Sequence, residues 1–227
     1  MKLIKNPEMI RKLAQSSGYR EQFSGNVLED SRLFFFHSGE YIVKEGAAPE
    51  FLFYLCSGRA KLYLTHANGK VSLIDFFEPP CFIGEMELIS DAHEPRDVQA
   101  LKDCYLFALP AKKFREPLLR DPRFLRNVCL LLEKKNQRNI ITASRNLSFP
   151  LSNRLAAFLL MAADHGIVRE KHVSTAEYLG VSYRHLLYVL ADFSKRGYIK
   201  KENGGYRITG REALLRLAKE MDPEWEL

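Results

Sequence analysis

Arg184, His185 and Tyr188 lie close together in the C-terminal part of the chain and carry side chains that can read DNA. An arginine guanidinium can donate two hydrogen bonds to O6 and N7 of a guanine, and histidine and tyrosine can contact a base edge or a phosphate. Ser182 comes just before them and suits a phosphate contact. We therefore expect these residues on the exposed side of a recognition helix that enters the major groove.

The surrounding sequence predicts the elements that would position these side chains. A short helix is expected over 175–179, with Ser174 as its N-cap and Glu177 reaching back to Ser174 in a capping box. Gly180 supplies the left-handed residue that ends this helix, and Ser182 caps a second helix. The buried face predicted for the second helix, at helical spacing, consists of Leu186, Leu187, Leu190 and Phe193.

A β-hairpin is expected to follow and to complete a winged helix-turn-helix. Gly197 ends the second helix, and Asn203-Gly204-Gly205 turns a strand at 198–202 into a strand at 206–209. A helical hairpin that packs for its own sake is the alternative, but the caps, the turn glycine, the apolar spacing and the wing together favour DNA binding. The predicted DNA-binding residues are Ser174, Thr175, Ser182, Tyr183, Arg184, His185, Tyr188, Lys200 and Lys201.

The composition is that of a globular chain with one or two domains. The 227 residues are 46% hydrophobic, with a net charge of +6 and a pI of about 9.1, which is compatible with a polyanionic partner. Basic residues are concentrated between 112 and 145, so DNA affinity would come from local placement of charge. No apolar run is long enough to span a membrane and no signal-peptide core is present, so we expect a cytoplasmic protein.

Short strands separated by turns are predicted from about Leu33 to Leu109. Ser38-Gly39, Ser57-Gly58 and Asn68-Gly69 are turn signals between apolar or alternating segments. Regular short strands of this kind predict a β-sandwich or jelly roll. A short amphipathic helix before them is expected to pack on this domain.

A long helix is expected after the strands. Asp121 can cap it, Pro122 suits its first position, and its apolar stripe thins past Glu133 before it returns at Ile140-Ile141. Such a helix can form the seam of a homodimer, which half-site reading by a helix-turn-helix commonly uses. The alternative is a helix that only packs on its own sandwich. Phe149-Pro150 breaks the helix and is expected to act as a hinge.

Together these elements predict an α+β fold class with three parts. The first, over 1–110, is an N-terminal helix with a β-roll. The second, over 111–148, is the dimerisation helix region, and the third, over 149–227, is the winged helix-turn-helix DNA-binding domain. The expected partners are double-stranded DNA with a palindromic operator and a second copy of the chain.

Catalytic and metal-binding motifs are missing from the sequence. The six histidines are scattered, and there is no phosphate-binding loop, Cys-x-x-Cys pair or metal-ligand spacing. We therefore expect no enzymatic activity, no metal and no other cofactor. The cysteines can be buried free thiols or redox-active groups, and both interpretations stay open for Cys56, Cys81, Cys104 and Cys129.

The order of β-roll, long helix, hinge and winged helix-turn-helix resembles the CRP/FNR family of bacterial transcription regulators, and within it the YeiL-type branch. The resemblance covers nearly the whole chain. It implies a dimeric DNA-binding regulator whose β-roll senses a signal and which contacts RNA polymerase. The motifs that carry it are Glu45-Gly46, Ser57-Gly58, Phe82-Ile83-Gly84-Glu85, Asn153-Arg154-Leu155-Ala156 and Leu179-Gly180-Val181-Ser182.

The resemblance also points to a ligand pocket at Gly84, Glu85 and Arg96. In family members that bind cyclic nucleotides, a Gly-Glu pair holds the ribose, and an arginine followed by serine or threonine holds the phosphate. Gly84 and Glu85 match the first half, but Arg96 is followed by Asp97, which places a negative charge where the phosphate should lie. We therefore expect a signal other than cyclic AMP.

Two further departures from the family shape the expected function. Many members place Glu and Arg at the positions of Arg184 and Tyr188, so the operator should differ from the usual family sequence. The iron–sulfur site of the FNR branch needs N-terminal cysteines, and this chain has none before Cys56. The alternatives that remain are a ligand-independent DNA binder and a redox-responsive regulator that acts through Cys81, Cys104 and Cys129.

Overall fold

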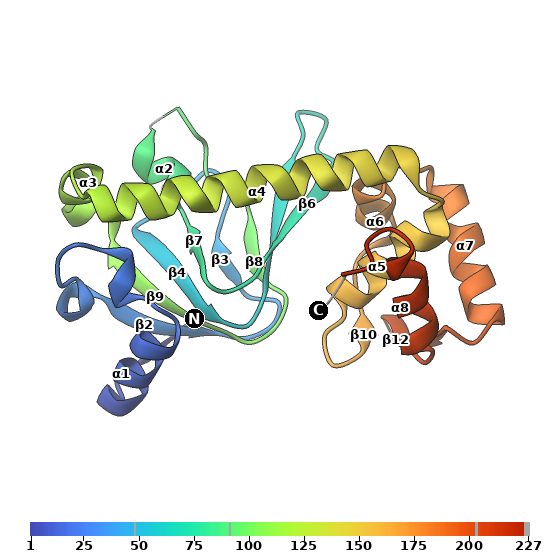
Figure 1. Cartoon of the computed structure of the whole chain (residues 1–227), viewed down its shortest axis with the longest axis horizontal. Coiled ribbons are helices and arrows are strands. Elements are labelled where there is room, and N and C mark those ends of the chain that lie inside the picture. Colours follow the sequence, from blue (N-terminus) through green and yellow to red (C-terminus); the bar gives the residue numbers. More distant parts are fainter. Residues whose placement is uncertain (48, 91, 203, 225–227) are drawn as a thin grey trace. The chain divides into compact units, whose positions relative to one another are not determined.

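A computed structural model describes residues 1–47, 49–90, 92–202 and 204–224 (Figure 1). The chain forms two compact units, Met1–Thr65 with Ile74–Gln137 and His66–Leu73 with Arg138–Leu227. The N-terminal unit is built on a β-roll and the C-terminal unit is a winged helix-turn-helix, so the predicted α+β fold class is confirmed. The predicted limits near 110 and 148 follow the ends of elements, whereas the two units divide within the long helix.

Two sheets make up the β-roll. The alternation of apolar and polar residues buries one side of each strand, and the non-sequential strand order closes the sheets over a common core. The first sheet has the order β1 (Lys2–Ile4), β2 (Arg32–Phe36), β9 (Cys104–Pro110), β4 (Phe51–Ser57) and β7 (Cys81–Ile83). The second has the order β3 (Tyr41–Val43), β8 (Val98–Ala100), β5 (Ala60–Thr65) and β6 (Val71–Phe77).

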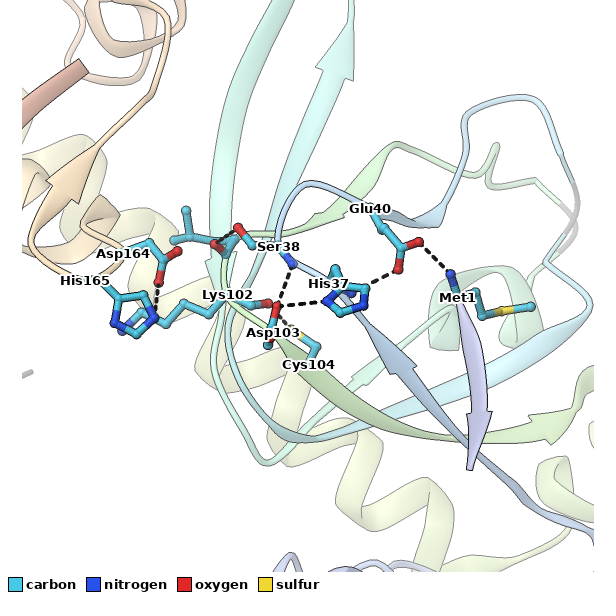
Figure 2. A network of polar contacts seen from close by, with 10 residues as sticks. Met1, His37, Ser38, Glu40, Lys102, Asp103, Cys104, Asp164 and His165 are labelled. Atoms are coloured by element: carbon cyan, nitrogen blue, oxygen red, sulfur yellow. Dashed lines mark hydrogen bonds and ion pairs between the residues drawn. The ribbon is translucent and has the colours of Figure 1, made fainter. Parts of the chain in front are cut away.

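Carboxylates hold the turn between β2 and β3, as Figure 2 shows. Asp103 Oδ1 accepts a hydrogen bond from the backbone N–H of Ser38 at 2.9 Å and lies 3.7 Å from His37 Nδ1. Glu40 accepts from the backbone N–H of His37 at 2.9 Å and from the N-terminal ammonium of Met1 at 2.7 Å. The predicted turn after β2 is therefore present, and it ties the start of the chain to the β-roll.

Side-chain caps set the start of two helices in this unit. Asn6 Oδ1 accepts from the backbone N–H groups of Glu8 and Met9 and caps α1 (Pro7–Ser16). Asp121 Oδ1 accepts from the backbone N–H of Phe124 at 3.2 Å and caps α4 (Pro122–Ser148), as predicted. The remaining helices are the short α2 (Glu85–Ile89), α3 (Ala111–Leu119) and two 3₁₀ turns, Arg20–Gln22 and Leu28–Asp30.

Aromatic side chains fill the core between the first sheet and the first turns of α4. Tyr19 stacks on Phe107 with ring centroids 4.4 Å apart, and Phe23 stacks on Phe124 of α4 at 5.8 Å. All four side chains are fully buried. Because each such pair contributes about 0.5–1.5 kcal/mol beyond its buried area, this contact fixes the start of α4 to the β-roll.

The C-terminal unit has the helices and the wing that the sequence predicts. The sheet contains one strand more than expected, because β10 pairs antiparallel with β12 in the order β10-β12-β11. Of the predicted turn Asn203-Gly204-Gly205, Asn203 lies outside the described residues. The elements are α5 (Leu151–Ala162), β10 (Ile167–Val168), α6 (His172–Tyr178), α7 (Tyr183–Lys195), β11 (Ile199–Glu202), β12 (Gly205–Ile208) and α8 (Arg211–Lys219).

Two local predictions in this unit were wrong. Ser174 does not cap α6, because the carbonyl of Lys171 already accepts the Thr175 N–H at 2.9 Å and the helix begins earlier. Leu187 is 37% exposed, and Val189 is buried in its place on α7. Successive helical residues are rotated by about 100°, and Val189 shares a side with Leu186 whereas Leu187 does not.

Within the described residues, no helix is long and apolar enough to cross a membrane.

Candidate nucleic-acid interface

α7 divides its side chains into a buried row and an exposed row. Leu186, Leu190 and Phe193 are buried, as the helical spacing predicted. Ser182 Oγ accepts the backbone N–H of His185 at 3.2 Å, which confirms its role as the N-cap. The exposed row at the start of the helix consists of Tyr183, Arg184, His185 and Tyr188, of which Tyr188 is 74% exposed.

The turn before α7 positions this exposed row. Gly180 has a φ of +61°, the left-handed conformation expected for the residue that ends the first helix. The backbone N–H of Val181 donates to the carbonyl of Ala176 at 2.9 Å, which closes the turn. Arg154 donates from Nη1 to the carbonyl of Leu179 and from Nε to the carbonyl of Phe149 at 3.0 Å. The turn is therefore tied to the residues of the predicted hinge.

Ser174 and Thr175 are the predicted DNA-binding residues that the structure does not place on this surface. Both side chains are buried, and Thr175 Oγ1 donates to the carbonyl of Lys171 at 3.1 Å. Their burial follows from the earlier start of α6, which turns these positions inward. Neither residue belongs to the exposed surface around α7.

A recess of about 500 Å³ lies between the start of α6, the start of α7 and the wing. The ring of His172 is 6.1 Å from the ring of Tyr183 and 5.7 Å from that of Tyr206. The cationic side chains that line the recess are Arg169, Lys171 and Lys201. Aromatic rings with polar tips and lysine or arginine side chains are groups that contact a DNA phosphate.

Sequence reasoning found Tyr183 and Lys201 but missed the other side of the recess. Arg169 and Lys171 follow β10, a two-residue strand that is too short to give a periodic signal. Gly205 allows the close approach of β10 to the wing, because a Cβ at this position would lie 2.1 Å from the carbonyl oxygen of Val168. The sequence predicts only a turn at Gly204-Gly205, whereas the structure shows that Gly205 is also required for packing against β10.

The wing carries its lysines on an exposed strand. Lys200 and Lys201 of β11 are both exposed, and they alternate across the two faces of the strand. Glu202 accepts from Arg207 Nε at 2.7 Å, and this ion pair lowers the pKa of Glu202 through the hydrogen bond from Arg207. Lys201 also lines the recess, together with Tyr183 of α7, so the wing and the start of α7 share this recess, whose lining also includes Glu170 and Glu202.

A second candidate site is the position that the family resemblance assigned to a ligand, in the N-terminal unit. Gly84 has a φ of +91° and turns the chain from β7 into α2. Glu85 is only 3% exposed, and its Oε1 lies 2.5 Å from Nζ of Lys135 on α4. Arg96 is exposed and makes no ion pair with any described residue, so the structure does not bring it to Glu85.

The ammonium of Lys135 is enclosed by groups that stabilise its charge. Its Nζ donates to the carbonyl of Phe82 at 3.3 Å and lies 4.5 Å from the ring centre of Phe77. Burial by itself would lower the pKa of Lys135, but the negative charge of Glu85 and the hydrogen bond to it raise the pKa above its ordinary value. Lys135 is thus charged at neutral pH and paired with the carboxylate of Glu85.

The cysteines occupy four separate environments. Cys81 and Cys104 are buried, Cys56 is half-buried, and Cys129 is exposed on α4. Burial raises the pKa of Cys56 to about 11 and that of Cys104 to about 12. These two thiols are therefore protonated at neutral pH and poorly reactive. No disulfide joins the four cysteines, and the described residues contain no cluster of metal-ligating side chains.

Comparison with known families assigns both units. The cyclic nucleotide-binding domain family matches residues 33–121, and the Crp-like helix-turn-helix domain family matches residues 153–217. The chain is 55% identical over 208 residues to the Regulatory protein YeiL of Escherichia coli O157:H7, which covers 92% of this chain and 95% of that protein.

More distant relatives agree with this assignment. The Cyclic AMP receptor protein of Thermus thermophilus is 25% identical over 181 residues, which covers 78% of this chain and 82% of that protein. A solved structure of a CRP/FNR family transcriptional regulator, also from Thermus thermophilus, has the same fold, with a TM-score of 0.64 at 21% identity, over 82% of this chain and 98% of that chain.

Proposed function

The chain belongs to the CRP/FNR family of transcriptional regulators, and we propose from this that it acts as a homodimer that binds a palindromic operator in double-stranded DNA. The observation that carries the proposal is the exposed row of Arg184, His185 and Tyr188 beside the basic and aromatic recess of the wing. Arg184 reads a guanine in the major groove, and Lys200 and Lys201 neutralise backbone phosphates. No part of this role requires catalysis.

α4 is the proposed dimer seam. Ile140 and Leu147 are one heptad apart on its exposed side. Leu147 is 91% exposed and Ile140 is 59% exposed, which is costly for a helix that remains in water. A second copy of α4 would cover this stripe, and a two-fold axis would present two recognition helices to the two half-sites of an operator.

The β-roll is proposed to respond to a signal other than cyclic AMP. Lys135 already neutralises Glu85, so a nucleotide ribose would have to displace a buried ion pair. The same observation favours a second candidate function, in which the regulator binds DNA without any ligand. A redox role through Cys81, Cys104 and Cys129 has less support, because Cys104 is buried and protonated. RNA polymerase is the expected partner on the promoter.

Selection of bound DNA from a random pool tests the proposal and its alternatives together. The selection is run with the protein alone, with cyclic AMP, with an oxidant and with a cell extract. One palindromic sequence is expected to be enriched in each selection whose conditions allow the protein to bind DNA. Equal recovery of all sequences would contradict sequence-specific binding. Enrichment with the protein alone supports the ligand-independent alternative, whereas dependence on oxidant or on extract identifies the class of signal.

A further inference from the structure

A cavity of about 380 Å³ lies in the N-terminal unit, and neither Glu85 nor Lys135 lines it, although Gly84 and Glu87 do. It is formed where α2 and α3 meet the segment that precedes β8. Its lining combines basic groups with an apolar wall and one carboxylate. The residues that define it are His93, Lys112, Arg115, Glu87, Leu88 and Pro95.

The basic side of the cavity comes from α3. Lys112 and Arg115 are three residues apart on this helix and therefore share a side. The first turn of α3 contains no acidic residue. Arg115 has a polar or electrostatic partner in the structure, whereas Lys112 makes no hydrogen bond or ion pair with any part of the chain that the structure describes. Its charge is thus available to an anion that enters the cavity.

The opposite side of the cavity is apolar. Leu88 is buried, and Pro95, which lines the same cavity, is half-buried. Glu87 of α2 also lines the cavity, and burial raises the pKa of its carboxyl group. Small-molecule sites combine such an apolar wall with a few convergent polar groups that fix the orientation of the ligand. Here the polar groups are mainly cationic.

We propose that this cavity binds a small organic anion with an apolar body, such as an aromatic carboxylate. The anionic group lies at Lys112 and Arg115, and the apolar body lies against Leu88 and Pro95. This class differs from a cyclic nucleotide, which would need a ribose acceptor and a phosphate site. The proposal goes beyond DNA binding because it locates a site for an effector.

The position of the cavity connects it to α4. Gly84 and Glu87 both line it, and Glu85, which directly follows Gly84, holds Lys135 of α4. A ligand that displaces α2 therefore changes the geometry of the ion pair between Glu85 of α2 and Lys135 of α4. Occupancy of the cavity is transmitted to the proposed dimer helix by this contact.

Benzoate is the probe, and benzamide is its uncharged counterpart of similar shape. Each is titrated into the full-length protein, without DNA, and binding is followed by the backbone amide signals in two-dimensional NMR spectra. We expect saturable shifts for benzoate at residues of α2, α3 and the segment before β8, and weaker binding of benzamide. Shifts of equal size for both probes, or benzoate shifts spread over unrelated surfaces, would overturn the proposal.

A matched pair of variants separates this site from a general effect of charge. Lys112→Met removes one of the two cavity cations of α3, whereas Lys113→Met removes a neighbouring lysine that pairs with Asp30 outside the cavity. We expect Lys112→Met to weaken benzoate binding by about fivefold, as loss of one exposed ion pair allows, and Lys113→Met to leave it unchanged. Lys112→Arg should restore binding. Equal losses of benzoate affinity in both methionine variants would contradict the assignment. Because no DNA is present, the result is independent of the proposed operator binding.

Discussion

Nζ of Lys135 lies 2.5 Å from Oε1 of Glu85, and the two side chains are only 15% and 3% exposed. The pair joins the helix α4 to the first residue of α2, fifty residues earlier in the chain. Such a buried pair adds little net stability relative to an apolar pair, but removal of one partner leaves the other charge uncompensated. The arrangement therefore specifies how α4 lies on the β-roll.

Lys135→Met should destabilise the N-terminal unit by about 3–5 kcal/mol, because Glu85 would remain buried without a cation. Urea denaturation followed by circular dichroism measures this loss. The double variant with Glu85→Gln should recover a large part of it, since no charge is then left unpaired. A double variant as unstable as Lys135→Met alone would show that packing, and not the uncompensated carboxylate, causes the loss.

Glu87→Gln should raise the melting temperature at pH 7 and leave it unchanged near pH 4. Burial raises the pKa of Glu87 in the folded protein, so the folded state binds this proton more tightly than the unfolded state. The stability contributed by the protonated group is present below the unfolded pKa and is lost as the pH rises through the folded pKa. Thermal melts at both pH values test this. A larger gain at pH 4 than at pH 7 would be inconsistent with the raised pKa.

Arg184→Ala should relax sequence preference at one base pair of the operator, at a cost of about 1–3 kcal/mol on the preferred sequence. Arg184 is exposed on the first turn of α7, where a bidentate contact to guanine can form. Binding of single-site operator variants by fluorescence anisotropy measures the effect. As a control, Lys201→Ala should weaken all sequences equally and reduce the salt dependence. If Arg184→Ala weakens the affinity for all operator variants equally, Arg184 does not read a base.

Ile140→Glu should weaken the dimer, because it places a charge in the exposed apolar stripe that Ile140 and Leu147 form on α4. Light scattering after size exclusion distinguishes the 26.2 kDa chain from its dimer. Asn139→Glu is the matched control, since this exposed neighbour points about 100° away from Ile140 around the helix. A dimer that survives both substitutions at low concentration would place the seam elsewhere.

Local sequence alone determined the elements of the proposed DNA interface. Gly180 and Ser182 mark the end of one helix and the cap of the next, and both roles depend on neighbouring backbone groups only. The spacing of Leu186, Leu190 and Phe193 similarly depends on helical periodicity. For this reason the exposed position of Arg184 was predictable from the printed residues.

Tertiary structure decided what lies next to those elements. The pairing of Glu85 with Lys135 and the recess of His172 with Tyr206 join segments that are distant in the chain, and no periodic pattern encodes such contacts. Serine is a typical N-cap residue, yet Ser174 is buried inside α6. The carbonyl of Lys171 accepts the first hydrogen bond of this helix, so the helix begins earlier in the chain. Long-range packing selects among local conformations that have similar free energies. The recognition helix could therefore be predicted from the sequence, whereas the pairing of Lys135 with Glu85 in the β-roll could not.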